Sequence, residues 1–154
     1  MGEKRPAMSG FLFLGPLHYA ERRSGRHLEA LGLPQGLKAA EAHLLAYLSA
    51  YAPCPLAQVQ RVFGHRRSTL TSLVDRFEEK GWVKRAMNPE DRRSFILSLT
   101  AEGRGVAERV HARMAEFEEE VLARTSDEEV HGFRAVLTAI AEVAAGPAGT
   151  GGEP

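Results

Sequence analysis

The stretch GWVKRAMNPEDRRSFILSLTAEG, residues 81–103, decides the fold of this chain. Two segments of alternating polarity within it, WVKR and FILS, predict short strands. A charged turn that carries Asp91, Arg92 and Arg93 separates them. Directly after the second strand, Thr100 suits the N-cap of a helix. The stretch therefore predicts a β-hairpin with a basic tip that leads straight into a helix.

An amphipathic segment, residues 68–80, lies directly before this hairpin. Its apolar residues recur at helical spacing and form one narrow stripe, while polar and charged residues lie opposite. Gly81 suits the end of this helix, since glycine adopts the left-handed conformation found there. A helix followed by a basic hairpin is the arrangement of a winged helix-turn-helix, a fold that reads DNA.

The remaining chain follows a helical period almost throughout. We expect helices over residues 16–31, 37–51, 55–63, 100–121 and 126–144. Ser126 and Glu129 have the spacing of a capping box at the start of the last helix. The expected fold class is mainly α with a small β-hairpin, in the order α-α-α-α-β-β-α-α.

Charge is distributed unevenly, although the chain has no net charge. Residues 61–93 hold nine Lys or Arg and five acids, a net charge of +4. Residues 100–145 hold five Arg and ten acids, a net charge of −5. A basic middle beside an acidic end suggests that one face meets an anion. The alternative is chance variation over an ordinary surface.

The cysteine count and hydropathy limit where the chain works. Cys54 is the only cysteine, so an intrachain disulfide is impossible and a reducing compartment fits. No apolar run approaches the roughly 20 residues that span a membrane, and no signal-peptide pattern is visible. We therefore expect a cytoplasmic protein without a membrane segment.

The helix over residues 68–80 is suited to the major groove at its N-terminal half. Base edges there are read by short polar side chains and by Arg, and free N–H groups at a helix start attract phosphate. The candidate DNA-binding residues of this segment are Arg66, Arg67, Ser68, Thr69, Thr71, Ser72 and Arg76. The acids of the segment, Asp75, Glu78 and Glu79, should point away from the groove.

The hairpin tip supplies a second candidate contact. An Arg on a thin loop can enter the minor groove, where the negative potential attracts it. Arg92 and Arg93 are the candidates, and we expect Asp91 to orient a nearby Arg by a charge-assisted hydrogen bond. The alternative is an exposed, salt-bridged turn on an unrelated α+β domain.

These residues resemble the MarR family of bacterial transcriptional regulators. The specific match is the wing signature Asp-Arg-Arg, five residues, then Leu-Thr-x-x-Gly, and the helix before it also fits. The resemblance covers about residues 11–145 and implies a recognition helix over 66–80 and a wing over 85–95. It places Arg93 in the minor groove, with Asp91 as its support.

The resemblance, together with a polar start and a Gly- and Pro-rich end of the sequence, predicts a domain organisation. It consists of a flexible N-terminus (1–9), dimerisation helices (10–34 and 104–145), a winged-helix DNA-binding domain (35–103) and a disordered tail (146–154). The implied protein is a homodimer that binds a pseudo-palindromic operator in double-stranded DNA. Family members repress transcription and are often released by a small anionic or phenolic ligand, or by cysteine oxidation.

Some positions depart from the family pattern. Arg66 stands where a Ser or Asp cap is usual, after His65, where an apolar residue is common. Cys54 lies between helices rather than in the first helix, so thiol sensing is not expected. His43 with Glu41, and His111, lack a His-x-x-x-His pair, so we expect no metal and no cofactor.

An effector pocket is a further expectation for the first helices. His18, Tyr19, Arg22 and His43 are its candidate lining, with surface or dimer packing as the alternative. No catalytic site is expected, because the chain has neither a nucleophile–base arrangement nor a phosphate-binding loop. A winged-helix module that binds protein without reading DNA remains the second candidate function.

Overall fold

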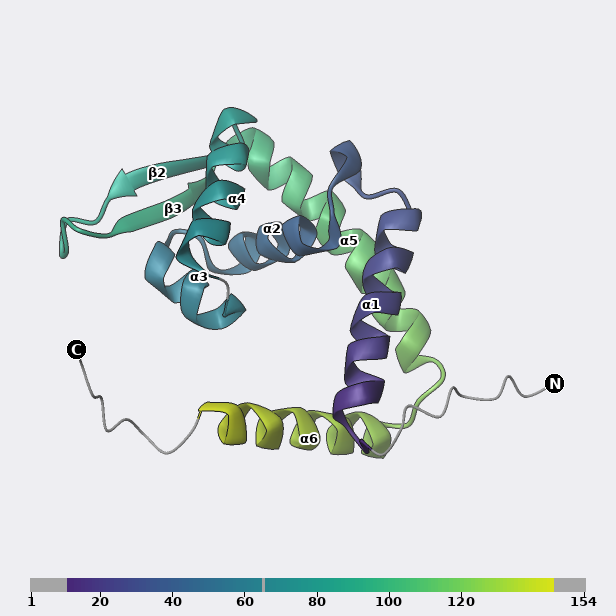
Figure 1. Ribbon diagram of the computed structural model, residues 1–154. Coiled ribbons are helices and arrows are strands. Elements are labelled where there is room, and N and C mark those ends of the chain that lie inside the picture. The colour runs from purple at the N-terminus through teal and green to yellow at the C-terminus, as the bar shows by residue number, and fades with distance from the viewer. Residues whose placement is uncertain (1–10, 65, 146–154) are drawn as a thin grey trace. The chain divides into compact units, whose positions relative to one another are not determined.

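The structure, a computed structural model, describes residues 11–64 and 66–145. The expected flexible N-terminus, the expected disordered tail and His65 lie outside the described residues. The elements are α1 (Leu14–Ala30), the 3-10 helix η1 (Pro34–Gly36), α2 (Ala39–Tyr51), β1 (Cys54–Pro55), α3 (Leu56–Phe63), α4 (Arg67–Glu79), β2 (Val83–Met87), β3 (Phe95–Leu99), α5 (Ala101–Leu122) and α6 (Asp127–Ala145) (Figure 1). The predicted class, mainly α with a small hairpin, is confirmed.

The sheet has three antiparallel strands in the order β1-β3-β2. The hairpin pairs Val83 with Leu99 and Met87 with Phe95, so its tip is limited to residues 88–94. Cys54 pairs with Leu97 and adds the third strand, which the sequence did not predict. Two residues are too few to show strand alternation, and their pairing depends on a partner far along the chain.

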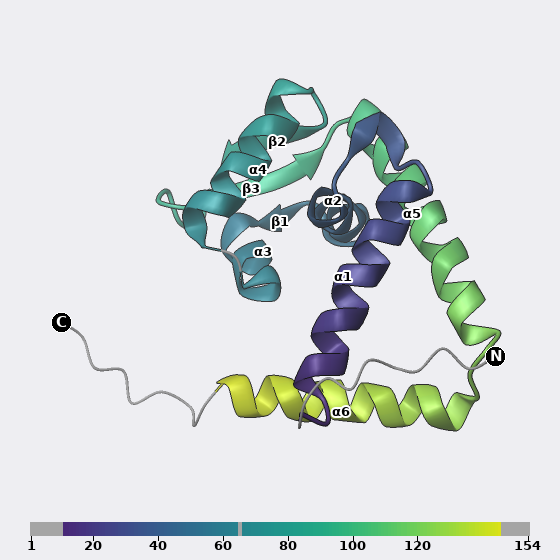
Figure 2. The ribbon, with the colours of Figure 1, turned by 45° about the vertical axis from the view of Figure 1, so that its right-hand side comes forward.

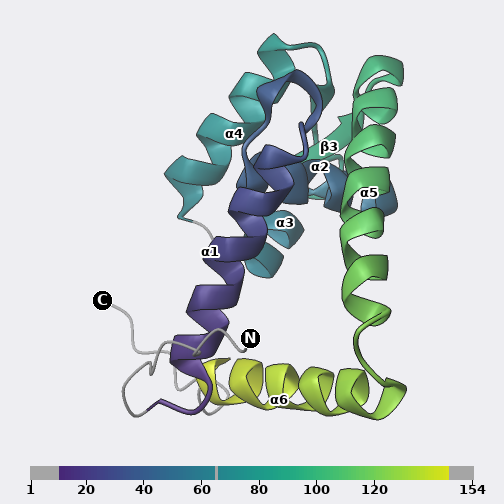
Figure 3. The ribbon, with the colours of Figure 1, turned by 90° about the vertical axis from the view of Figure 1, so that its right-hand side faces the viewer.

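The chain divides into two compact units, one up to Met114 and the other from Ala115. In the first unit, α3 and α4 lie beside the sheet (Figure 2), and α1 contacts α2 (Figure 3). The largest fully buried side chains all belong to this unit: Trp82, Phe77, Leu44, Leu45, Leu48, Leu70, Leu97, Val59, Val74, Val106 and Val110. A continuous core therefore holds the helix and the hairpin together.

The second unit is built differently. The predicted capping box is present, since the backbone N–H of Ser126 donates to the Glu129 carboxylate at 2.8 Å. Hydrogen bonds from Ser126 also lower the pKa of Glu129. Every described residue over 115–145 is exposed or half-buried, including Phe133 and Val143. In the part of the chain that the structure describes, the apolar side chains of this unit thus form no buried core.

One junction ties the hairpin to α5. The Thr100 hydroxyl donates to the carbonyl of Gly81 at 2.6 Å and accepts the backbone N–H of Gly103 at 2.9 Å. Thr100 therefore caps α5, as the sequence predicts, and also binds the backbone directly after the end of α4. A Cβ on Gly103 would lie 1.9 Å from the carbonyl oxygen of Trp82. Glycine is required there because the helix lies directly against backbone.

We expect Gly103→Ala to lower the free energy of unfolding by about 2 kcal/mol, because the new methyl group forces backbone apart in a packed region. Gly105→Ala is the matched control, since its Cβ would meet nothing nearer than the flexible Arg109 side chain at 3.9 Å. That control should gain up to about 1 kcal/mol from helix propensity. Urea unfolding of the three proteins measures both, and equal stabilities would contradict the junction's role.

Candidate nucleic-acid interface

The turn between α3 and α4 presents the start of α4 to solvent. Gly64 adopts φ 60°, a left-handed conformation that ends α3. Arg66 is the N-cap of α4 and makes no side-chain cap hydrogen bond, as the departure from the family pattern predicts. The first N–H groups of α4 therefore have no side-chain cap, which leaves them available to an anion.

The predicted polar face of α4 is largely exposed. Arg66, Arg67, Ser68, Thr69 and Ser72 are exposed, and Thr71 is half-buried. The opposite stripe, which comprises Leu70, Leu73, Val74 and Phe77, is buried. Burial on one side thus turns the short polar side chains outward, as base reading requires.

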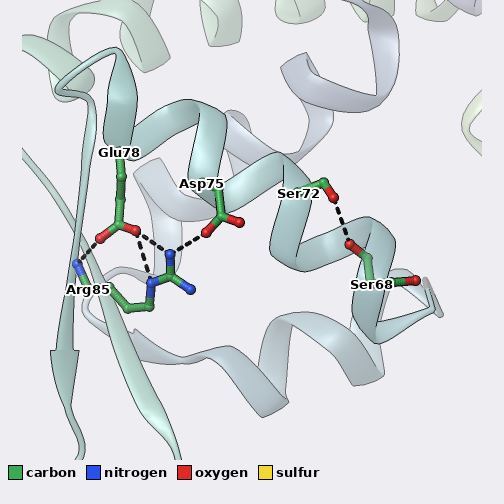
Figure 4. A network of polar contacts seen from close by, with 5 residues as sticks. All are labelled: Ser68, Ser72, Asp75, Glu78 and Arg85. Carbon is green, nitrogen blue, oxygen red and sulfur yellow. Dashed lines mark hydrogen bonds and ion pairs between the residues drawn. The ribbon is translucent and has the colours of Figure 1, made fainter.

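Arg85 on β2 binds two acids of α4, Asp75 and Glu78 (Figure 4). Its Nε donates to Glu78 Oε2 at 3.0 Å, and its backbone N–H donates to Glu78 Oε1 at 3.1 Å. Its Nη2 bonds both Asp75 and Glu78. These hydrogen bonds, from Glu78 first and then from Asp75, raise the pKa of Arg85 above its ordinary value.

This network gives the acids of α4 a structural role that the sequence did not reveal. Asp75 and Glu78 reach the wing strand and compensate Arg85, rather than simply pointing away from DNA. Arg85 was not a candidate residue, because its partners lie seven and ten positions earlier on another element. The alternation of β2 was the available signal, since it places Arg85 on the strand face that carries buried Val83.

Arg76 lies apart from the other candidates. Its Nη2 is 2.8 Å from Oε1 of Glu41, whose side chain is only 9% exposed. The other oxygen of Glu41 accepts the backbone N–H of Lys38 at 2.8 Å at the start of α2. This ion pair therefore links Arg76 on α4 to α2 and holds α4 in place.

The wing tip is held by its own backbone. Asp91 Oδ1 accepts the backbone N–H of Arg93 at 3.0 Å, and the Asp91 carbonyl accepts that of Ser94 at 2.9 Å. Asp91 thus shapes the turn, rather than orienting a guanidinium as the sequence suggested. Within the described residues, Arg92 and Arg93 are exposed and no ion pair engages them.

The candidate effector residues lie on two helices, α1 and α2. His18, Tyr19 and Arg22 are exposed on α1, and His43 is exposed on α2. The Arg23 guanidinium lies over the Tyr19 ring, 5.7 Å from its centre. A hollow of about 430 Å³ lies further along α1 and is lined by Arg23, Arg26 and His27.

Cys54 and the histidines offer little to a redox or metal site. Cys54 is buried, and burial raises the pKa of its thiol, which disfavours the reactive thiolate. No group of three or more metal-ligating side chains occurs in the described ranges. No helix in that part of the chain is long and apolar enough to cross a membrane.

An exposed polar helix beside a hairpin with a basic tip defines a winged-helix DNA-binding protein. The sequence profile of the MarR family matches residues 35–94. The regulator PecS of Dickeya dadantii is 35% identical over 130 residues, which cover 82% of this chain and 78% of PecS. The chain therefore belongs to the MarR family and is a DNA-binding transcriptional regulator.

Solved structures agree with this assignment. A mutant of MarR from E. coli, complexed with operator DNA, has a TM-score of 0.71 at 26% identity. The match covers 85% of this chain and 99% of the MarR chain. The PcaV regulator of Streptomyces coelicolor, complexed with its natural ligand, has a TM-score of 0.70 at 25% identity. This match covers 94% of this chain and 99% of the PcaV chain. These relatives are regulators rather than enzymes, and a module without DNA readout is not favoured.

We expect Arg85→Gln to weaken operator binding about tenfold or more, because two carboxylates on α4, Asp75 and Glu78, lose their counter-charge and repel phosphate. Lys84→Gln is the matched control, since Lys84 is exposed on the other face of the same strand. Fluorescence anisotropy with labelled DNA, well below the melting temperature of both variants, measures the difference. Equal affinities of the two variants would refute the role of Arg85.

Proposed function

We propose that this regulator represses transcription as a homodimer bound to a pseudo-palindromic operator, and that a small molecule releases it. The dimer works in the cytoplasm. Each protomer inserts α4 into the major groove and the wing tip into the adjacent minor groove. The contacting residues are Arg66, Arg67, Ser68, Thr69, Thr71, Ser72, Arg92 and Arg93, while Asp91 and Arg76 act by holding the wing turn and α4.

The distribution of paired and unpaired charge carries this proposal. In the described chain, no carboxylate pairs with the guanidinium groups of Arg66, Arg67, Arg92 or Arg93, whereas Arg85 and Arg76 are paired. Four free cations therefore sit at the start of α4 and at the wing tip. Two separated cationic points suit the phosphates and the minor groove of one duplex.

We expect Arg93→Ala to weaken operator binding more than tenfold, and to reduce the slope of log affinity against log salt by about one if a phosphate contact is lost. Lys38→Ala at the start of α2 is the control, because the Lys38 side chain is exposed and lies outside the proposed DNA contacts and the dimerisation helices. Anisotropy titrations at several salt concentrations provide the measurement. Unchanged affinity would remove Arg93 from the interface, and an absence of salt-sensitive binding by the wild type would overturn the whole proposal.

The homodimer is supported by apolar side chains that one chain leaves uncovered. Phe11, Leu12 and Phe13 precede α1 and are 48–78% exposed, and Phe133 and Val143 on α6 are 57% and 83% exposed. Water contact with so many large apolar groups is unfavourable, and a second copy removes it. The expected organisation is dimerisation helices at residues 10–34 and 104–145 around a DNA-binding domain at residues 35–103.

Sedimentation equilibrium without DNA should therefore give twice the mass of one chain across the micromolar range. Phe133→Asp should shift this equilibrium toward monomer, because a buried, unpaired carboxylate is costly at an interface. Glu128→Gln, on the same helix, should leave it unchanged. A monomeric wild type would contradict the proposed dimer. It would not test the proposed DNA contacts of a single protomer.

Release by a small molecule is supported by PcaV, whose structure holds its natural ligand. We propose His18, Tyr19, Arg22 and His43 as effector-binding residues. The cationic hollow at Arg23, Arg26 and His27 favours an anionic ligand near the same helix. Adding aromatic carboxylates to the preformed DNA complex tests this, and release that survives His18→Ala together with Arg22→Ala would place the ligand elsewhere.

A further inference from the structure

Ser68 and Ser72 form the outer ridge of α4, opposite the buried stripe. They lie one helical turn apart in the N-terminal half of the helix, and both are exposed. Asp75 follows on the same ridge, but Arg85 holds it toward the wing. The two serines are therefore the ridge residues that remain open to a base edge.

The hydroxyl proton of Ser72 is already used within the helix. Ser72 Oγ donates to the carbonyl oxygen of Ser68 at 3.0 Å (Figure 4). A serine hydroxyl has one proton and two lone pairs, so Ser72 retains acceptor capacity only. No such bond involves the hydroxyls of Ser68 or Thr69 in the described structure, and these two can both donate and accept.

A side chain that can only accept a hydrogen bond can pair with only some of the base groups in the major groove. Guanine presents N7 and O6, and thymine presents O4, and all three atoms are acceptors. Cytosine presents its N4 amino group, and adenine presents its N6 amino group beside N7. Only the amino groups can donate to Ser72.

We infer that Ser72 is a specificity-determining residue that accepts a hydrogen bond from an exocyclic amino group, of cytosine or adenine, in each operator half-site. This inference rests on the proposed placement of α4 in the major groove. It assigns Ser72 a different role from those of Arg66 and Arg67, whose charges favour phosphate irrespective of sequence.

Selection of bound sequences from random DNA locates the contact. The wild type and Ser49→Ala should select the same half-sites, because Ser49 loses the same hydroxyl but lies on α2, outside the proposed DNA contacts and dimerisation helices. Ser72→Ala should lose preference at one base pair per half-site, by about three- to tenfold, the worth of one hydrogen bond. Identical preferences in all three proteins would overturn the inference, whereas no selection by the wild type would overturn the proposed function instead.

Base analogues at that pair then identify the group that Ser72 contacts. Removing the exocyclic amino group, with purine for adenine or pyrimidin-2-one for cytosine, should weaken wild-type binding by about three- to tenfold. The same analogue should not weaken binding by Ser72→Ala. Any loss that this variant does show measures the effect of weaker base pairing and is subtracted from the wild-type loss. Replacing the purine of the pair by its 7-deaza analogue should have no Ser72-dependent effect. A loss that requires Ser72 and appears only with the 7-deaza base would show that Ser72 donates, and would refute the inference.

Discussion

The first turn of α5 lies against the backbone of Trp82, and the rest of the DNA-binding unit depends on this contact. Gly103 permits the approach, because any side chain would overlap the Trp82 carbonyl. Thr100 bonds the carbonyl of Gly81 and caps α5 at the same point. The end of α4, both hairpin strands and the start of α5 are thereby fixed together.

Charge pairing completes this framework. Arg85 joins the wing strand to α4 through Asp75 and Glu78, and Arg76 joins α4 to α2 through the buried carboxylate of Glu41. Each pair places a cation and an acid on different elements, so it fixes orientation as well as balancing charge. The unpaired Arg residues remain at the start of α4 and at the wing tip. The paired charges fix α4 and the wing strand, and the unpaired charges lie at the candidate DNA interface.

Much of the fold was predictable because its signals are local. Helical spacing, the caps at Thr100 and Ser126, and the alternation around the basic turn each depend on neighbouring residues. The exposure of the polar face of α4, and that of Arg92 and Arg93 in the turn, also follow from local patterns. The signal failed where a residue depends on a distant partner. Cys54 becomes a strand only by pairing with Leu97, and Arg85 is held by Asp75 and Glu78, which lie on another element.

The sequence by itself determined the class of protein, the order of its elements and the candidate surface for DNA, because periodicity and turn chemistry depend on consecutive residues. Only the tertiary structure decided which charges are free. It assigned Asp75, Glu78 and Glu41 to Arg partners and left four Arg residues unpaired at the candidate interface. The Arg partners of these three acids lie on other elements, so they follow from distances in space, and spacing along the chain does not contain them.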